Sequence, residues 1–113
     1  MENKRQRIIS PSVAEQVKQF NIDRDWDQFH SPENLAKSIA IEAGELLECF
    51  QWGPDYDLRA VKEELADVVN YCIVMADRLD LDLDQIVLEK LRVNERKYPV
   101  EKARGRSTKY DKL

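Results

Sequence analysis

Apolar residues recur three and four positions apart along most of the chain, a spacing that predicts amphipathic helices. No segment of useful length alternates apolar with polar residues and no stretch is repeated, so neither strands nor a repeat architecture are expected. We predict four helices, over residues 10–26, 31–50 or 52, 58–79, and 82 or 84–98. The connections between the last three helices are short, which favours antiparallel neighbours and an all-α, up-down four-helix bundle.

Local signals mark the ends of these helices. Serine–proline pairs at 10–11 and 31–32 are typical helix starts, because serine caps the free amide groups and proline fits the first turn. A glycine–proline pair at 53–54 ends the second helix. An aspartate caps the fourth helix, and Pro99 ends it because proline disfavours helical backbone at the preceding residue.

The length of 113 residues predicts one domain over 1–113, with a flexible start at 1–10 and a basic tail at 99–113. A bundle this small has a thin core, so we expect a homo-oligomer. No apolar run approaches the ~20 residues that span a bilayer, and no apolar segment follows the charged N-terminus, so we expect a cytoplasmic protein with no membrane partner. Cys49 and Cys72 fall within helical patterns and are expected to be reduced thiols in the core.

Charge is unevenly distributed along the chain. The net charge is −4, but residues 99–113 carry five basic and two acidic side chains, a net charge of +3, which leaves −7 on residues 1–98. A nucleic-acid-binding protein normally has a broad basic face, so we expect no nucleic acid partner. An acidic body with a basic tail suits a site where carboxylates hold metal cations and nearby cations hold a polyanionic ligand.

Two pairs of carboxylates lie beside the apolar stripes of the second and third predicted helices. Glu42 occupies a position at which the apolar stripe of the second helix is interrupted, and Glu45 lies about one turn later on the same side. Glu64 and Asp67 flank the next stripe, with Tyr71 on the same side. The stripes consist of Leu35, Ile39, Leu46 and Cys49 in the second helix and of Val61, Leu65, Val68, Cys72 and Leu79 in the third.

Four carboxylates that converge across an interhelical groove repel one another, and a divalent cation relieves that repulsion. A set of oxygen ligands favours a hard ion, Mg²⁺ or Mn²⁺, over zinc. Taken by themselves, the pairs are also typical of a solvated or salt-bridged helix face. A di-iron site is disfavoured, because it needs Glu-x-x-His motifs and the only histidine, His30, lies outside such a motif.

The same carboxylates carry a resemblance to a known family. The strings EAGE (42–45) and ELAD (64–67), separated by 18 residues, match the two-part ExxE and ExxD signature of the all-α nucleoside triphosphate pyrophosphohydrolases, the MazG-like superfamily. Longer segments closely resemble its dCTP pyrophosphatase subgroup, and the resemblance covers about residues 13–113. These segments are RDWDQFHSPENL (24–35), GELLECFQW (44–52), EELADVVNY (63–71) and NERKYPVEKARGRSTKY (94–110).

The resemblance implies a fold, a reaction and a set of metal ligands. The fold is a helical bundle completed by homo-oligomerisation, as a dimer or a tetramer. The reaction is the Mg²⁺-dependent cleavage of a nucleoside triphosphate between its α and β phosphates, which yields a monophosphate and pyrophosphate. By the same resemblance Glu42, Glu45, Glu64 and Asp67 are the Mg²⁺ ligands, and Glu45 or Glu42 orients or deprotonates the attacking water.

The resemblance also implies residues that bind substrate. His30 and Trp52 match a base-binding pocket, and Trp26 is a further planar group on which a nucleobase can stack. Asn34 and Tyr71 are expected to face the substrate. Candidates for contact with the phosphates are Lys37 and, in the fourth helix and tail, Asn94, Lys97, Tyr98, Arg104, Lys109 and Tyr110. Aromatic residues at helix ends also serve as core plugs, and a basic tail can simply be solvated.

These observations lead to the hypothesis of a nucleotide pyrophosphohydrolase that cleanses the nucleotide pool, with dCTP or a modified pyrimidine deoxynucleotide as favoured substrate. Two alternatives stay open. One is the same reaction on dUTP or a purine nucleotide, since the loop at 53–59 is shorter than in much of the resembled subgroup and borders the expected pocket. The other is a helical oligomer that binds nucleotides or a protein without catalysis.

Overall fold

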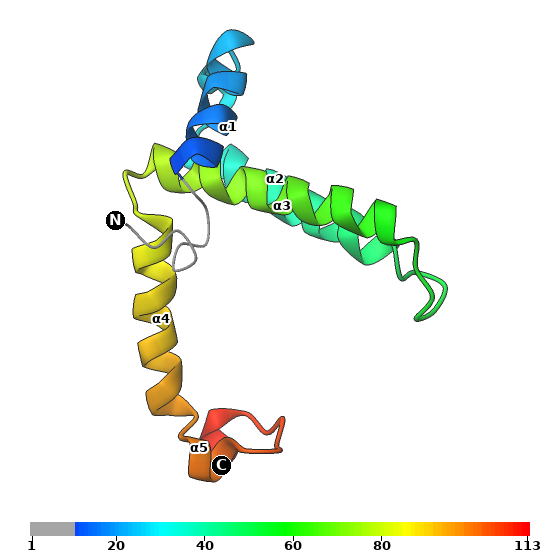
Figure 1. The fold of residues 1–113 in the computed structure, drawn as a ribbon, viewed down its shortest axis with the longest axis vertical. Helices are drawn as coiled ribbons and strands as arrows, with labels where there is room; N and C mark the ends of the chain where they lie inside the picture. The colour runs from blue at the N-terminus through cyan, green and yellow to red at the C-terminus, as the bar shows by residue number, and fades with distance from the viewer. Residues whose placement is uncertain (1–10) are drawn as a thin grey trace.

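The computed structural model describes residues 11–113, and every regular element in that range is helical (Figure 1). The elements are α1 (Pro11–Asp23), η2 (Asp27–Phe29), α2 (Pro32–Glu48), α3 (Leu58–Arg78), α4 (Leu83–Lys97), α5 (Val100–Ala103) and η3 (Tyr110–Lys112), where η denotes a short 3₁₀ helix. The prediction of an all-helical chain is confirmed for these residues. The predicted flexible segment 1–10, with its expected helix-capping serine, lies outside the described residues. None of the described helices combines the length and the apolar character needed to cross a membrane.

Side-chain caps start the helices where local signals predicted them. The hydroxyl of Ser31 accepts a hydrogen bond from the amide of Asn34, and the carboxylate of Asp82 accepts one from the amide of Gln85, each at 3.2 Å. The serine cap of the second helix is therefore confirmed, and Asp82 is the cap of the fourth. The second helix ends at Glu48, earlier than predicted, because the following residues tighten into i to i+3 turns before the glycine at 53.

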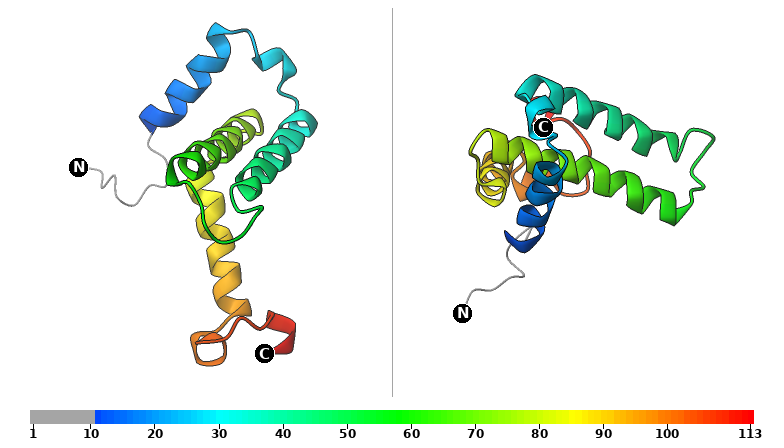
Figure 2. Two further views of the ribbon diagram at one scale, coloured as in Figure 1. Left: turned by 90° about the vertical axis from the view of Figure 1, so that its right-hand side faces the viewer. Right: turned by 90° about the horizontal axis from the view of Figure 1, so that it is seen from above.

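α2 and α3 form an antiparallel hairpin that holds the core of the chain (Figures 1 and 2). Leu35 of α2 is 0% exposed, and Ile73 and Ala76 of α3 are also buried. α1 packs against α3 at the C-terminal half of that helix. The two cysteines are free thiols, as predicted.

The inward face of α3 differs from the predicted stripe. Glu64 is half-buried, whereas Leu65 is 50% exposed and Leu79 is exposed as well. The prediction that both leucines line the core is wrong. Glu64 shares the inward face with Val68 and Cys72 at helical spacing, which leaves Leu65 on a half-exposed flank. The carboxylate, not the leucine, therefore points toward α2.

α4 does not return to pack along the hairpin. It leaves the end of α3 and projects away from it (Figures 1 and 2), and extensive helix packing among residues 11–113 is confined to the pairs α2–α3 and α1–α3. The radius of gyration is 17.2 Å, against about 13 Å for a compact domain of about 100 residues. One chain therefore does not close the predicted four-helix bundle.

The tail after Pro99 is held by contacts within the chain. The rings of Tyr98 and Tyr110 meet edge to face, with their centroids 6.1 Å apart. The ammonium group of Lys97 lies 4.7 Å from the centroid of the Tyr110 ring. Aromatic and cation–π contacts thus hold the end of the chain against the end of α4.

Two aspartates in the left-handed conformation end α1 and α3. Asp25 has a φ of 54° and Asp80 a φ of 55°. After α1, the amide of Asp25 donates to the carbonyl of Ile22, and the amide of Trp26 donates to the carbonyl of Asn21, each at 3.0 Å. This pair of bonds is a Schellman motif, which reverses the chain and sets the position of Trp26.

We expect Leu35→Ala to lower the free energy of unfolding by about 2–5 kcal/mol, because it removes a fully buried side chain from a small core. Leu47, which is 71% exposed on the same helix, provides the matched control, and its alanine variant should change stability by less than about 0.5 kcal/mol. Urea unfolding followed by circular dichroism, at one protein concentration, measures both. Equal losses for the two variants would show that the core lies elsewhere.

Candidate metal centre and adjoining cavity

The α2–α3 hairpin brings the two predicted pairs of carboxylates to one place. Oxygen atoms of Glu42, Glu64 and Asp67 lie within 4.8 Å of one another. The carboxyl group of Glu45 is hydrogen-bonded to those of Glu42 and Glu64. Residues three apart on each helix therefore meet across the hairpin, as the spacing of the ExxE and ExxD strings requires.

The close approach of these groups perturbs their protonation. Burial, followed by the hydrogen bond to Glu45 and by the neighbouring carboxylates, raises the pKa of Glu42 from 4.5 to about 7. The hydrogen bond to Glu45 and then desolvation raise the pKa of Glu64 above its ordinary value. The site thus holds more negative charge than it can carry without a counter-charge, either protons or a cation.

A stability trend with pH follows from Glu42. Between pH 4.5 and about 7 the folded chain holds a proton that the unfolded chain has released, so the free energy of unfolding falls as the pH rises through this window. We expect the melting temperature in EDTA to fall from pH 5 to pH 7 and to fall less in Glu42→Gln. We also expect Mg²⁺ to raise the melting temperature more at pH 8 than at pH 6, because cations compete with protons for carboxylates. If the melting temperature in EDTA depended on pH identically in the wild type and in Glu42→Gln, the raised pKa of Glu42 would be contradicted.

The residues fit a hard divalent cation. Every donor in the cluster is a carboxylate oxygen, the ligand type of Mg²⁺ and Mn²⁺. One oxygen each of Glu42 and Glu64 is buried and has no hydrogen-bond partner among residues 11–113. Buried polar atoms are normally paired, so these two oxygens point to a ligand that supplies the missing contact.

A cavity of about 460 Å³ adjoins the carboxylates and lies between α1 and α3. Asp67 belongs both to the metal cluster and to the wall of this cavity. Three predicted site residues, Trp26, His30 and Tyr71, line the same cavity. The volume lies within the range of small-ligand pockets, and the lining combines planar rings with a few polar groups.

His30 and Tyr71 face each other in this cavity. Their rings meet edge to face with centroids 6.4 Å apart. The Nδ1 atom of His30 is buried and lacks a hydrogen-bond partner among the described residues. It is the third such side-chain atom found there, after the oxygens of Glu42 and Glu64, so the unpaired buried groups coincide with predicted site residues.

Other predicted site residues lie elsewhere. Trp52 is 93% exposed in the loop at the far end of the hairpin. Lys37 is exposed and lies 3.9 Å from Glu33 in an ion pair within α2. Asn34 uses its side-chain amide to donate to the carbonyl of Phe29, which holds the entry to α2. None of the three lines the cavity beside the carboxylates.

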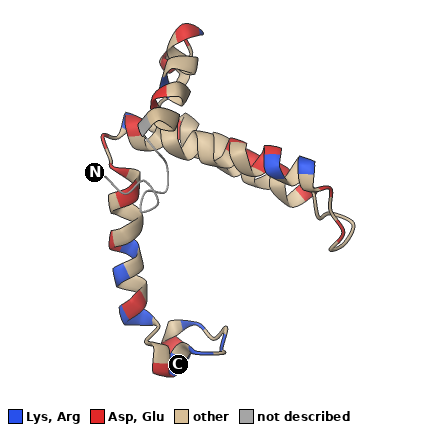
Figure 3. Cartoon of the chain, viewed as in Figure 1, with Lys and Arg blue, Asp and Glu red and all other residues tan. Residues whose placement is uncertain are grey.

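The phosphate-binding candidates predicted in the fourth helix and tail lie at the opposite end of α4 from α3 and in the following tail (Figures 1 and 3). Lys and Arg residues lie along the C-terminal half of α4 and in the loop after α5. These predicted phosphate-binding candidates are Asn94, Lys97, Tyr98, Arg104, Lys109 and Tyr110. The fold of a single chain therefore keeps the basic tail apart from the carboxylate cluster.

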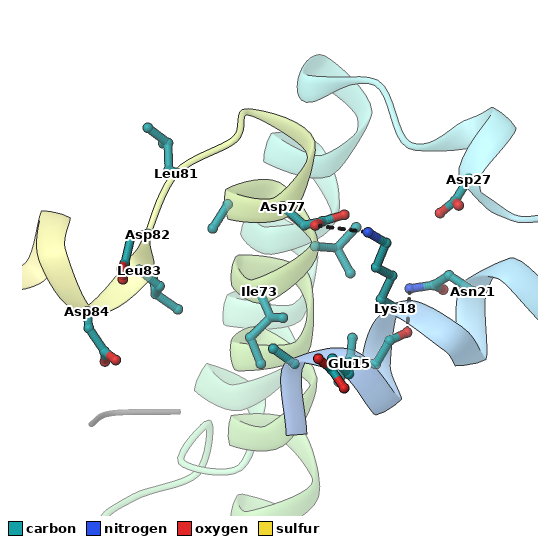
Figure 4. Close-up of a pocket in the computed structure, with 14 residues that line it drawn as sticks. Glu15, Lys18, Asn21, Asp27, Ile73, Asp77, Leu81, Asp82, Leu83 and Asp84 are labelled. Atoms are coloured by element: carbon teal, nitrogen blue, oxygen red, sulfur yellow. Dashed lines mark hydrogen bonds and ion pairs between the residues drawn. The ribbon is translucent and has the colours of Figure 1, made fainter. Parts of the chain in front are cut away.

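A second cavity, of about 340 Å³, lies on the other side of α1, against the end of α3 and the start of α4 (Figure 4). Lys18 reaches across it to Asp77 at 3.7 Å. The remaining charged residues in its lining are the acidic Glu15, Asp27, Asp82 and Asp84. This excess of carboxylates repels a polyanion, so the cavity beside Trp26 is the better candidate for an anionic ligand.

Two residues of functional interest were not predicted from the sequence. Asn70 lines the cavity one helical turn after Asp67, and its spacing from that carboxylate could have identified it. Arg78, at the end of α3, donates hydrogen bonds to the carbonyls of Asp27 and His30. No local signal marks Arg78, because its acceptors are backbone atoms 48 and 51 residues away.

Comparison with known proteins identifies a family, curated relatives and a solved structure to which the chain is similar. The model of the MazG-like family matches residues 37–113. The chain is 42% identical over 105 residues to dCTP pyrophosphatase 1 of Bos taurus and 41% identical to that of Homo sapiens. Each match covers 84% of this chain and 62% of the relative, so the chain spans less than two thirds of these proteins. The crystal structure of a pyrophosphatase from Archaeoglobus fulgidus is similar, with a TM-score of 0.71, 37% identity, and coverage of 78% of this chain and 90% of that one.

Proposed function

The chain belongs to the MazG-like family, and from this premise we propose that it hydrolyses a nucleoside triphosphate between the α and β phosphates. The products are the monophosphate and pyrophosphate, and the favoured substrate is dCTP or a related, modified pyrimidine deoxynucleotide. The likeness to vertebrate dCTP pyrophosphatases supports this substrate class. The observation that carries the proposal is the junction of the carboxylate cluster with the ring-lined cavity at Asp67.

The carboxylates are proposed to hold Mg²⁺, with Mn²⁺ as an alternative. Glu42, Glu64 and Asp67 supply the clustered oxygens, and Glu45 lies against two of them. When bound, the cation neutralises charge on phosphate oxygens and lowers the pKa of a bound water. We assign the deprotonation of the attacking water to one of the two α2 carboxylates, since Glu42 belongs to the cluster and Glu45 lies against it.

The cavity is proposed to hold the base and sugar. Trp26 offers a ring face on which a base can stack, for about 1–3 kcal/mol. His30 and Asn70 offer polar atoms for the edge of the base, and Nδ1 of His30 is buried without a partner among the described residues. A base in this cavity would extend its triphosphate toward Asp67, which lies where the cavity meets the carboxylates.

A second copy of the chain is proposed to complete the bundle and the site. The surface of the described residues carries twenty large apolar side chains that are at least about a third exposed, including Leu88 and Leu91 of α4. Such a surface is typical of a subunit and not of a monomer. The basic tail and Trp52, which one chain keeps away from the cluster, could reach the carboxylates of a neighbour. The proposed oligomer is a dimer or a tetramer.

Pyrophosphate release from a panel of dNTPs and NTPs, with Mg²⁺ and with EDTA, tests the proposal. We expect Mg²⁺-dependent pyrophosphate and dCMP from dCTP, and slower release from the other nucleotides. Preference for dUTP or a purine nucleotide would keep the reaction and overturn the base assignment. Absence of pyrophosphate from every nucleotide, with a folded protein, would overturn the enzymatic function and favour a binding role.

A further inference from the structure

The segment that carries Trp26 and His30 has little helical structure of its own. It consists of the Schellman turn at Asp25 and the three-residue helix η2, Asp27–Phe29. Both ring-bearing residues flank η2, with Trp26 before it and His30 after it. The position of these rings relative to α3 therefore depends on contacts that cross from the segment to the helix.

Arg78 makes two such contacts. Its Nε–H donates to the carbonyl of His30 at 2.9 Å, and its Nη2 donates to the carbonyl of Asp27 at 2.7 Å. Apart from the hydrogen bond between the carboxyl groups of Glu45 and Glu64 in the cluster, the other side-chain hydrogen bonds described in residues 11–113 join residues at most five positions apart. An arginine in the last turn of a helix commonly interacts with the carbonyls of that helix. Arg78 instead donates both hydrogen bonds to a segment that is distant in the sequence, so it links that segment to α3.

The place of Arg78 on α3 connects it with the site. Asp67, Tyr71 and Arg78 are four and then seven residues apart, so they follow one face of the helix. Asp67 and Arg78 are separated by three turns, about 16 Å along the axis. A single straight helix thus carries a metal-ligand candidate, one wall of the cavity and the arginine that holds the opposite wall.

We propose that Arg78 is a positioning residue for base recognition, which holds the Trp26–His30 segment at a set distance from the carboxylate cluster through the carbonyls of Asp27 and His30. This role rests on the proposed function, since it assumes that the cavity takes the base. The guanidinium fork suits the task because two donors in a rigid plane fix both the position and the orientation of the segment. A lysine at this position could form only a point contact and should support the segment less well.

The kinetic test compares the wild-type protein with Arg78→Met, Arg78→Lys and Arg59→Met. Arg59 is the matched control, because it lies on the same helix, is paired only locally with Glu63, and touches neither the segment nor the cluster. We expect Arg78→Met to raise the KM for dCTP by about 10-fold while kcat changes much less, since misplacement of a binding group by about 1 Å can cost up to about 100-fold. Arg78→Lys should lie between this variant and the wild type, and Arg59→Met should match the wild type.

A base-free substrate separates positioning from general damage. For 1,2-dideoxyribose 5-triphosphate, which keeps the sugar and phosphates, kcat/KM should be the same in Arg78→Met and the wild type. Equal losses on dCTP and on this compound would overturn the proposal and assign Arg78 a merely structural role. An unchanged KM for dCTP in folded Arg78→Met would overturn it as well. If the methionine variant does not fold, the same comparison is made with Arg78→Lys.

A measurement without nucleotide keeps this proposal distinct from the proposed function. In a Trp52→Phe background the only tryptophan is Trp26, and its quenching by acrylamide reports how the segment is held. We expect stronger quenching after Arg78→Met and no change after Arg59→Met. If the wild type hydrolyses no nucleotide, the proposed function fails, and increased quenching still supports the hold of Arg78 on the segment. Unchanged quenching in Arg78→Met overturns that hold whatever the activity.

Discussion

Glu64→Gln is expected to reduce pyrophosphate release from dCTP by about 10²–10³-fold or more, the loss typical when one group that stabilises the transition state is removed. Glu64 contributes an oxygen to the three-residue cluster, and one of its oxygens is buried without a partner among the described residues. Glutamine keeps the size of the side chain but removes the charge that a hard cation requires. Initial rates at saturating Mg²⁺ and dCTP measure the loss, with circular dichroism to follow the fold.

The neighbouring Glu63 provides the control for this variant. It is exposed, forms a 3.7 Å ion pair with Arg59, and is not one of the clustered carboxylates. Glu63→Gln makes the same chemical change one residue away and should leave the rate within about 2-fold, because exposed ion pairs contribute little. Glu64→Gln should not unfold the protein, since the carboxylate that it removes is desolvated and repelled by its neighbours. A folded Glu64→Gln protein with more than a tenth of the wild-type rate would rule out the metal assignment.

The second large effect is expected at the exposed apolar face of α4. We expect the wild-type protein to have a solution mass that is a multiple of 13.3 kDa, and the double variant Leu88→Glu, Leu91→Glu to shift toward the mass of one chain. The two leucines lie on one face of α4 and are about half exposed. Their burial in an interface is worth on the order of 3 kcal/mol, or about 100-fold in association, before the cost of burying two charges is added.

Light scattering coupled to gel filtration measures this mass at several protein concentrations. Lys90→Glu is the control, because it places the same residue on the same helix but on the opposite side from the leucines. It should retain the wild-type mass. If the site needs a second chain, the double variant also loses turnover even though its carboxylates are intact. A wild-type protein that stays monomeric at micromolar concentration would contradict the proposed assembly.

Local chemistry explains why most helix boundaries could be predicted. The cap at Ser31 and the stop at Pro99 act on their nearest neighbours, so the sequence alone locates them. For the fourth helix the sequence offered Asp82 or Asp84 as the cap, and the structure selects Asp82. The end of the second helix was placed too late, because the tight turns before Gly53 continue a helix-like pattern with i to i+3 hydrogen bonds in place of those of an α-helix. The short helix η3 at the end of the tail was missed for the opposite reason, since the contact between Tyr98 and Tyr110 stabilises a segment with little local preference.

The sequence by itself determined the spacing of the carboxylates, because residues three apart on a helix must share a face. That Glu64 and not Leu65 points inward was decided by the rotation of α3 against α2, which depends on packing along the whole hairpin. Only the tertiary structure placed Trp26 and Asp67 in the lining of one cavity and left Trp52 exposed at the other end of the hairpin. These relations rest on contacts between residues far apart in the chain, which local patterns do not record, as the long-range bonds of Arg78 illustrate.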